Sequence, residues 1–387
     1  MVKKKQVYLD YAATTPIDPR VMQAMMPYFS EEFGNPSSYH YYGQSAENAL
    51  ENARDKVAKY FQCLSSEVIF TSCGTESDNL ALRGTAIQAL KERGASHILI
   101  TPVEHHAVTR TAQQLSKFYG FELEYLPVDQ LGRVNIDDLI TRIRQDTAIV
   151  SIIYANNEIG TINPIGAIGE ICRSRGVTFH TDAVQAGAYL SLNVNSLQTD
   201  LVSIGAHKFY GPKGIGALYV RQGTSIIPAQ TGGGQEFGLR AGTQNIPYIV
   251  GLAEALDIAQ TERENRIRSV KHLRDHLIGT ILEEISDVQL TGHPDERLPN
   301  HASFVFYGVD GNALLMMLDI EGFACSSGSA CKTGNPEPSE VLSSLGITRD
   351  WALGSLRVTL GNLTTAAEIE EFLSVLPKVI SKLRKIR

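Results

Sequence analysis

EVIFTSCGTESDNLALRGTAIQALKERGASHILI (67–100) contains the pattern that decides the fold: a β-rich run, a helical stretch that ends near a glycine, and a second β-rich run. Glycine is common where helices end, because it adopts the left-handed backbone conformation at little cost. The alternation continues in the β-rich runs AIVSIIYA (148–155), GVTFHTD (176–182), DLVSIGA (200–206) and GIGALYV (214–220). Strands that alternate with helices favour a mostly parallel sheet with helices on both faces, so we expect an α/β fold.

The chain changes character after the glycine cluster TGGGQEFGLRAGTQN (231–245). A long, charged helical pattern follows at about 249–284 and could connect two domains. Beyond it, ASFVFYG (302–308) and SLRVTLG (355–361) are candidate strands, and residues 366–386 form an amphipathic helical pattern with a basic end. The last part of the chain therefore indicates a smaller α+β unit.

The length of 387 residues exceeds that of an average domain. We expect a large domain over residues 16–260 and a small domain formed by both chain ends, residues 1–15 and 261–387.

Composition argues against several classes of partner. The formal charge of -7 and the pI near 5.8 leave no basic excess of the kind that nucleic-acid binding usually needs. The first residues, MVKKKQVYLDYAATT (1–15), lack the apolar run of a secretory signal, and no later stretch reaches transmembrane length. We therefore expect a cytoplasmic protein with no nucleic-acid or membrane partner.

Five cysteines are widely scattered, unlike a disulfide framework, and no tight cysteine pair with partner histidines indicates a zinc site. We expect free thiols and no metal. The cysteines are Cys63, Cys73, Cys172, Cys325 and Cys331.

The segment DLVSIGAHKFYGPKGIGALYV (200–220) is the most informative about chemistry, because Lys208 follows a strand and precedes a turn rich in glycine and proline. At the carboxyl end of a strand in an open α/β sheet, a lysine amine can form a Schiff base with a carbonyl cofactor. Taken alone, Lys208 fits a solvated surface loop better than a catalytic role, because loops are mostly exposed, and the neighbouring motifs reverse that preference. Upstream, Asp182 also ends a strand, where a carboxylate could pair with a protonated pyridine nitrogen or simply cap a helix. Gln185 could donate to a phenolate oxygen of the same ring.

Two further segments suit a phosphorylated ring. In IFTSCGTESDNLAL (69–82), the chain passes from a strand through Gly74 and Thr75 into a helix, and the free amides at a helix start can bind a phosphate. A plain helix cap at Thr75 is the alternative. In PVEHHAV (102–108), His105 could lie on the face of the ring or be a neutral packing histidine.

Together these motifs resemble those of the aminotransferase-like pyridoxal-phosphate enzymes, and more narrowly the chain resembles the NifS/IscS-like cysteine desulfurases. The motifs that carry the resemblance are YLDYAATTP, FGNPSS, FTSCGTESDN, EHHAV, ANNEIGT, FHTDAVQ, AHKFYGPKGIGALY, AGTQN, SSGSAC and SLRVTLG. The resemblance implies fold type I, pyridoxal 5'-phosphate as cofactor, and conversion of L-cysteine to L-alanine. It also implies that sulfur passes to Cys331 as a persulfide and then to an acceptor or scaffold protein, for iron-sulfur cluster assembly or tRNA thiolation.

The same resemblance implies a role for each candidate residue. Lys208 would be the Schiff-base lysine, Asp182 the partner of the ring nitrogen, and Gln185 the donor to the phenolate oxygen. His105 would stack on the ring and move protons. The residues implied to hold the phosphate are Gly74, Thr75, His207 and, from the neighbouring subunit of a homodimer, Thr243.

Substrate residues follow from the resemblance as well. Arg357 would bind the carboxylate of the amino acid through a two-pronged contact, with help from Asn157, which would also contact the cofactor. Cys331 lies in a stretch rich in Ser, Gly and Pro (325–341), which predicts a mobile loop that carries sulfur to an acceptor. His105 would help to deprotonate the Cys331 thiol.

Two positions depart from the family pattern. Gly205 stands where many relatives have a serine that touches the phosphate, and Phe237 stands where many have an arginine. The alternatives that remain are a selenocysteine lyase, a plain aminotransferase, and a catalytically idle platform for an assembly complex. The presence of Lys208, Asp182 and Cys331 argues against an idle platform.

Overall fold

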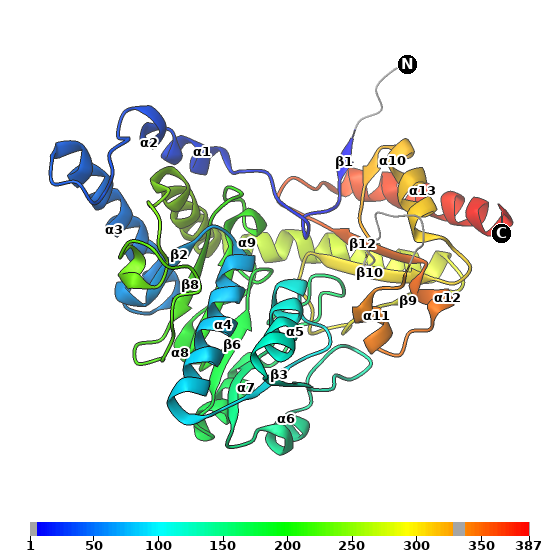
Figure 1. The fold of residues 1–387 in the computed structure, drawn as a ribbon. Helices are drawn as coiled ribbons and strands as arrows, with labels where there is room; N and C mark the ends of the chain where they lie inside the picture. The colour runs from blue at the N-terminus through cyan, green and yellow to red at the C-terminus, as the bar shows by residue number, and fades with distance from the viewer. Residues whose placement is uncertain (1–5, 328–336, 387) are drawn as a thin grey trace.

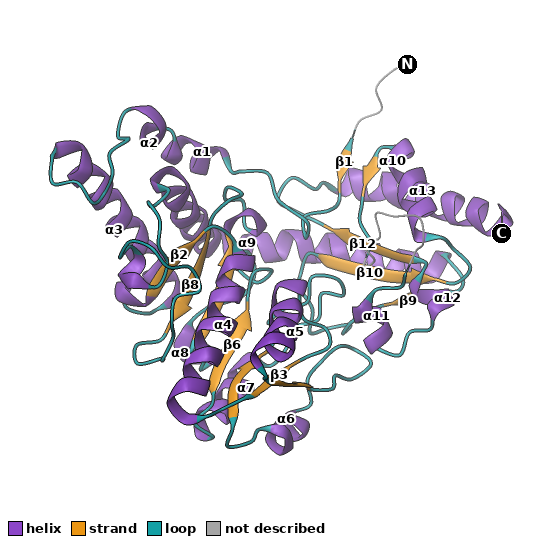
Figure 2. Cartoon of the chain, viewed as in Figure 1, coloured by secondary structure: helices purple, strands orange, loops and turns teal. Residues whose placement is uncertain are grey.

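The computed structural model describes residues 6–327 and 337–386, and its largest feature is a seven-stranded sheet (Figures 1 and 2). Its strands are β2 (Val68–Thr71), β3 (His97–Ile100), β4 (Glu122–Tyr125), β5 (Thr147–Ser151), β6 (Thr178–Asp182), β7 (Leu201–Gly205) and β8 (Gly216–Val220). They lie in the order β2-β8-β7-β6-β5-β3-β4. The β4-β3-β5-β6-β7 neighbours are parallel, whereas β8 runs antiparallel to β2 and β7. The predicted α/β fold with a mostly parallel sheet is therefore confirmed.

Strand β4 is a part of this sheet that the sequence did not predict. It reads ELEY, leaves Glu122 and Tyr125 exposed, and lies at the end of the strand order. An edge strand of this kind lacks the continuous apolar run that marks the buried strands of a parallel sheet.

Helices cover both faces of the sheet because alternate strand residues point to opposite sides. Ile98 and Ile100 pack in the cluster that includes α4 (Gly74–Arg93) and α5 (His106–Tyr119), whereas Leu99 packs in the cluster of α7 (Ile165–Ser174). Helix α4 ends at Gly94, whose φ of +67° is the left-handed conformation that a helix C-terminus favours.

A second, smaller group of strands and helices comes mostly from the part of the chain after the long helix α9 (Ile246–Glu284), together with β1 near the N-terminus. Its three-stranded sheet has the order β12-β10-β9, and a parallel pair joins β1 to β11. These strands and the flanking helices gather on one side of the molecule (Figure 1). Their bounds are β1 (Val7–Tyr8), β9 (Val288–Leu290), β10 (His301–Phe306), β11 (Phe323–Ala324), β12 (Ser355–Thr359), α10 (Gly311–Glu321) and α13 (Ala366–Ile386).

Helix α9 passes through residue 260 without interruption, so the domain boundaries at residues 15 and 260 stay a prediction. Within residues 6–327 and 337–386, no helix combines the length and the apolar character needed to span a lipid bilayer. The remaining helices are α1 (Pro19–Met25), α2 (Pro27–Ser30), α3 (Tyr41–Phe61), α6 (Ile136–Arg142), α8 (Val194–Leu197), α11 (Glu340–Ser344) and α12 (Arg349–Ala352).

Candidate functional site

A cavity of about 260 Å³ lies where the carboxyl ends of β6 and β7 meet the start of α4, the N-terminal segment and β12. Ligands in open α/β sheets commonly bind at this edge. The cavity brings together every predicted cofactor and substrate residue except Thr243. These residues are Gly74, Thr75, His105, Asn157, Asp182, Gln185, His207, Lys208 and Arg357.

Lys208 ends a short 3₁₀ turn that follows β7, and its amine reaches back to the N-terminal segment. Its Nζ donates hydrogen bonds to the carbonyl oxygens of Ala12 (2.6 Å) and Ala13 (2.8 Å). Burial, together with the charge of Arg357, lowers the pKa of Lys208 to about 8, although nearby carboxylates oppose the shift. A lowered pKa increases the neutral fraction of the amine, which is the form that attacks an aldehyde.

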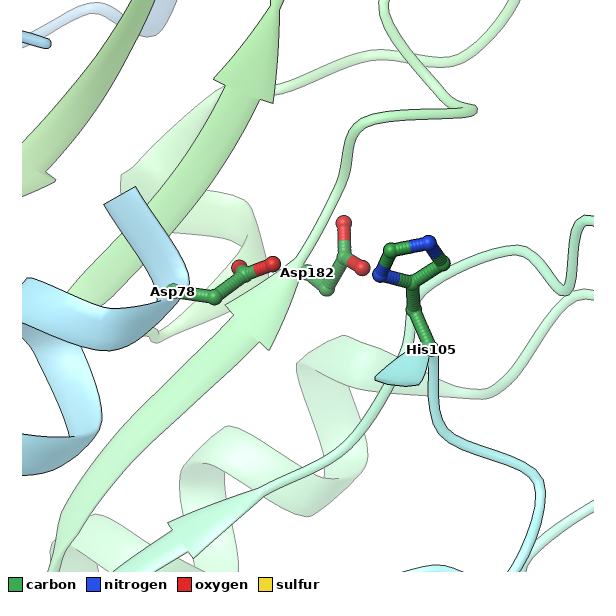
Figure 3. Close-up of side chains that lie close together, drawn as sticks. All are labelled: Asp78, His105 and Asp182. Carbon is green, nitrogen blue, oxygen red and sulfur yellow. The ribbon is translucent and has the colours of Figure 1, made fainter. Parts of the chain in front are cut away.

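Two carboxylates and one imidazole that line the same cavity as Lys208 lie close together (Figure 3). Asp182, at the end of β6, points toward the ring of His105. Asp78 of α4 lies on the side of Asp182 that faces away from His105. One donor atom from each of the three lies within 4.8 Å of the others. Asp182 accepts a hydrogen bond from the amide of Val184 (2.9 Å), and the buried Oδ1 of Asp78 makes no hydrogen bond within the described part of the chain.

Such a cluster favours a bound cation or a positively charged N-H group. Burial raises the pKa of Asp78 well above its ordinary value, with the charge of Asp182 as the next cause, and burial also raises the pKa of Asp182. A protonated pyridine nitrogen would relieve this cost. The same three side chains could also hold a metal ion. Lys208 and the Gly74–Thr75 turn line the same cavity, which favours a ring nitrogen beside Asp182 over a metal ion.

His105 occupies the N-cap position of α5, where its Nδ1 accepts a hydrogen bond from the amide of Ala107 (3.1 Å). This contact leaves the proton of the neutral ring on Nε2. The ring of His105 lines the cavity. Desolvation by the surrounding protein is the largest cause that lowers the pKa of His105. Asp182 acts in the opposite direction, whereas Lys208 and His106 lower the pKa further.

The start of α4 contains the turn that is predicted to bind the phosphate. The first amides of a helix have no partner within the helix, and Gly74 and Thr75 are the first two residues of α4. A Cβ at Gly74 would come within 2.5 Å of the Val184 side chain, so the turn is tightly enclosed. Burial lowers the pKa of His207 to about 4, with Lys208 and Lys213 as further causes, so this ring is neutral at pH 7.

Arg357 of β12 is held by two contacts. Its Nη1 donates to the carbonyl oxygen of Asn157 (2.8 Å), and its Nη2 donates to Oδ1 of Asp10 (2.9 Å). Gln185, which lines the same cavity, donates from Nε2 to the carbonyl oxygen of Ala12 (2.9 Å). An arginine fixed in this way is suited to bind a carboxylate.

Thr243 and Cys331 are the two remaining predicted site residues. Thr243 is exposed and does not line the cavity, which is compatible with the prediction that it serves the site of a neighbouring subunit. Cys331 lies outside the described residues. The described residues on either side of that segment, Ser327 and Glu337, both line a second cavity of about 550 Å³. This second cavity shares His105, Asn157 and Arg357 with the first, so the two adjoin.

The other cysteines differ in environment. Burial raises the pKa of Cys63 and of Cys172 to about 12 and also raises that of Cys325, so these thiols are poorly ionised near pH 7. Cys73 lines the cavity directly before the Gly74 turn.

Sequence reasoning missed several contributors to the site. Asp10, Ala12 and Ala13 come from the motif YLDYAATTP, which carries the resemblance but received no role of its own. Asp78 looked like an ordinary acidic residue in the first turns of a helix.

Comparison with known proteins gives consistent similarities. The Aminotransferase class-V family model matches residues 7–372. A protein named cysteine desulfurase IscS from Dictyoglomus turgidum is 48% identical over 383 residues, which cover 99% of this chain and 96% of that protein. The solved structure of a NifS-like protein has a TM-score of 0.91 at 37% identity and covers 98% of this chain and 100% of its own. A structure of SspA in complex with cysteine has a TM-score of 0.79 at 33% identity, covering 92% and 99% of the two chains.

Proposed function

Because the chain belongs to the Aminotransferase class-V family and is a pyridoxal-phosphate-dependent cysteine desulfurase, we propose that the cavity around Lys208 is its active site and that Cys331 is the first sulfur acceptor. The family relationship confirms the resemblance seen in the sequence motifs. One observation carries the assignment of the site: Lys208, Asp182 and Arg357 come from distant parts of the chain and line one cavity.

The residues of the cavity fit pyridoxal phosphate. The bound cofactor supplies an electron sink that makes bonds at the substrate α- and β-carbons easier to break. Lys208 would bond to its aldehyde carbon, and Asp182 would accept the hydrogen bond of its ring nitrogen. Gln185 would donate to its phenolate oxygen. Gly74, Thr75 and His207 would hold its phosphate.

The substrate would bind through its carboxylate. Arg357 keeps hydrogens on its terminal nitrogens that the contacts with Asp10 and Asn157 do not use, and these can point to a carboxylate.

The Lys208 amine, once released from the aldehyde carbon, would move the proton at the substrate α-carbon. Because His105 borders both cavities, we propose that its Nε2 moves the thiol proton of Cys331.

The sulfur-transfer step balances without an outside oxidant. The Cys331 thiolate attacks the sulfur of the substrate, an S–S bond forms, and the bond between that sulfur and the β-carbon breaks. The electron pair of the broken bond remains on the organic fragment, which takes up a proton and leaves as L-alanine.

A homodimer would complete the phosphate site by bringing Thr243 from the partner. The arm formed by α1, α2 and the start of α3 projects from the molecule (Figure 1) and exposes large apolar side chains. Exposed patches of this kind commonly mark protein interfaces. These side chains are Met22, Met26, Phe29, Phe33, Tyr39, Tyr41 and Tyr42.

We further propose an acceptor or scaffold protein for iron-sulfur cluster assembly or tRNA thiolation as the destination of the sulfur, since the similar chain from Dictyoglomus turgidum bears the name IscS. The chemistry needs a reduced thiol at Cys331, which favours a reducing compartment such as the cytoplasm.

The direct test measures alanine release from L-cysteine by the purified holoenzyme. Lys208→Ala should lose the lysine-dependent absorbance of the cofactor and release no alanine. Cys331→Ser should keep the absorbance and lose turnover, whereas the matched variants Cys63→Ser and Cys172→Ser should retain it. Normal turnover by Lys208→Ala would contradict the proposed site. A clear preference for L-selenocysteine over L-cysteine would instead indicate a lyase.

A further inference from the structure

Asp10 joins two segments that meet at the edge of the cavity. Its Oδ1 accepts a hydrogen bond from Nη2 of Arg357 (2.9 Å), and its Oδ2 accepts one from Oγ of Ser326 (2.7 Å). The side chains of Arg357 and Asp10 are only 9% and 15% exposed. An ion pair so shielded from water is screened less than a surface pair, and its geometry is correspondingly better defined.

The backbone around these three residues is fixed by further hydrogen bonds. The amide of Leu9 donates to Ala324 (2.9 Å), and the amide of Thr359 donates to Leu9 (2.8 Å). Ser326 and Arg357 exchange backbone hydrogen bonds in both directions, at 2.7 and 3.3 Å. The Asp10 carboxylate is therefore placed between its two partners by main-chain pairing, not only by side-chain attraction.

The contacts of Arg357 define the orientation of its guanidinium. Each terminal nitrogen carries two hydrogens, and the protein uses one on Nη2 for Asp10 and one on Nη1 for the carbonyl oxygen of Asn157. One hydrogen on each terminal nitrogen and the hydrogen on the buried Nε remain, and a guanidinium can present such hydrogens in pairs to a carboxylate. Without Asp10, the Nη2 side of the guanidinium would lose its fixed partner and could rotate.

We infer that Asp10 is a positioning residue: it orients the guanidinium of Arg357 for the substrate carboxylate, and Ser326 in turn holds Asp10. This inference rests on the proposed role of Arg357 in the same cavity. It assigns a function to the aspartate of the motif YLDYAATTP. It also places Ser326 in a short chain of contacts that ends at the substrate.

The experiment compares Asp10→Ala, Asp10→Asn and Ser326→Ala holoenzymes with the natural protein. For each protein, kcat and KM for L-cysteine are determined separately. The dissociation constant of the product L-alanine is determined from the change in cofactor absorbance. Loss of a charge-assisted contact corresponds to a weakening of about tenfold or more. We expect this rise in both KM and the L-alanine constant for Asp10→Ala, with kcat less affected and the cofactor retained. Asp10→Asn keeps the shape of the side chain and should give a smaller rise.

Combined variants test whether Ser326 acts on Arg357 through Asp10. Since Ser326 acts through Asp10, the double variant Asp10→Ala/Ser326→Ala should bind L-alanine no more weakly than Asp10→Ala alone. Independent, additive losses would overturn this order. Asp146→Asn removes a carboxylate from a different Asp–Arg pair that lines neither cavity and should leave every constant unchanged.

Parallel measurement of Arg357→Ala distinguishes a failure of the inference about Asp10 from a failure of the proposed contact between Arg357 and the substrate. If Arg357→Ala weakens binding and both Asp10 variants bind L-alanine normally, the inference about Asp10 is wrong and the active site stands. If Arg357→Ala also binds L-alanine normally, the proposed substrate contact itself fails.

Discussion

The low pKa of Lys208 makes a prediction about cofactor uptake. Burial, with the charge of Arg357, disfavours the protonated amine and lowers its pKa from 10.5 to about 8. Because only the neutral amine attacks an aldehyde, the rate at which the cofactor-free protein takes up pyridoxal phosphate should rise as the pH increases through about 8. Stopped-flow absorbance over a pH series measures this rate. A midpoint close to 10.5 would show that the amine is not perturbed.

Asp182 should matter through its charge. Asp182→Asn keeps the size of the side chain but removes the negative partner proposed for the ring nitrogen, so kcat for alanine release should fall about 100-fold or more, as for other preorganised electrostatic partners. Asp137→Asn, at an exposed position in the first turn of α6, serves as the control. Equal activity of the two variants would remove Asp182 from the mechanism.

The end of β7 lies close to the start of α4, the segment proposed to bind the phosphate, and this proximity can be tested by substitution at Gly205. A Cβ at Gly205 would lie 3.3 Å from the amide nitrogen of Gly74, and the backbone there is extended (φ −137°), so a small side chain fits with a slight shift. Gly205→Ser should therefore add a hydroxyl contact and tighten cofactor binding by about tenfold.

Gly205→Ala adds the same Cβ without a hydroxyl and is the matched control for that change. Cofactor dissociation constants from fluorescence titration compare the two variants. If Gly205→Ser binds pyridoxal phosphate no better than Gly205→Ala, the hydroxyl does not reach the phosphate.

A buried ion pair anchors the loop that carries Thr243. Glu236 accepts two hydrogen bonds from Arg54 (2.8 and 2.9 Å) and one from the amide of Phe70 in β2 (2.8 Å). Glu236→Gln would leave the buried charge of Arg54 with only the exposed carboxylate of Glu51 (3.3 Å) as an acidic partner, and should destabilise the protein by about 3 kcal/mol, measured by urea denaturation.

The surface pair between Lys56 and Glu254 (2.7 Å) provides a control for that measurement. It is more exposed, with side-chain exposures of 47% and 25%, so Glu254→Gln should cost less than about 1 kcal/mol. Similar losses for both variants would mean that burial of the Arg54 pair is not what makes it matter.

The sequence predicted elements well where local pattern decides structure. Strands β5 to β8 are apolar runs bounded by turns, and the helical stretch expected between the two β-rich runs of residues 67–100 is α4, which ends at Gly94. The prediction missed β4 because the half-exposed ELEY run has no apolar pattern. An edge strand of this type is defined by its pairing with β3, which is not a local property.

Dimerisation makes the prediction that concerns the whole molecule. Thr243→Ala should weaken cofactor binding by about tenfold while the protein stays dimeric in size-exclusion chromatography with light scattering, because one hydroxyl contact to the partner's phosphate is lost. Thr231→Ala, in the same glycine-rich segment, should bind the cofactor normally. Unchanged affinity in Thr243→Ala would end its proposed role across the interface.

The assembly of the site is the part that local sequence could not supply. The residues of the cavity were predicted because a family resemblance linked their motifs, not because their spacing brings them together. Asp10 and Arg357 form a contact although 347 positions separate them. Their meeting depends on how β1, β11 and β12 pair in the folded chain. The place of Thr243 depends on a second subunit.

The most direct test of the whole account is to locate the sulfur after a single turnover. The holoenzyme is mixed with one equivalent of L-cysteine, quenched with a thiol-blocking reagent, and digested for peptide mass spectrometry. We predict one additional sulfur atom on the peptide that contains Cys331, together with one equivalent of L-alanine. Alanine formed at the normal rate with no sulfur on that peptide would contradict the central claim.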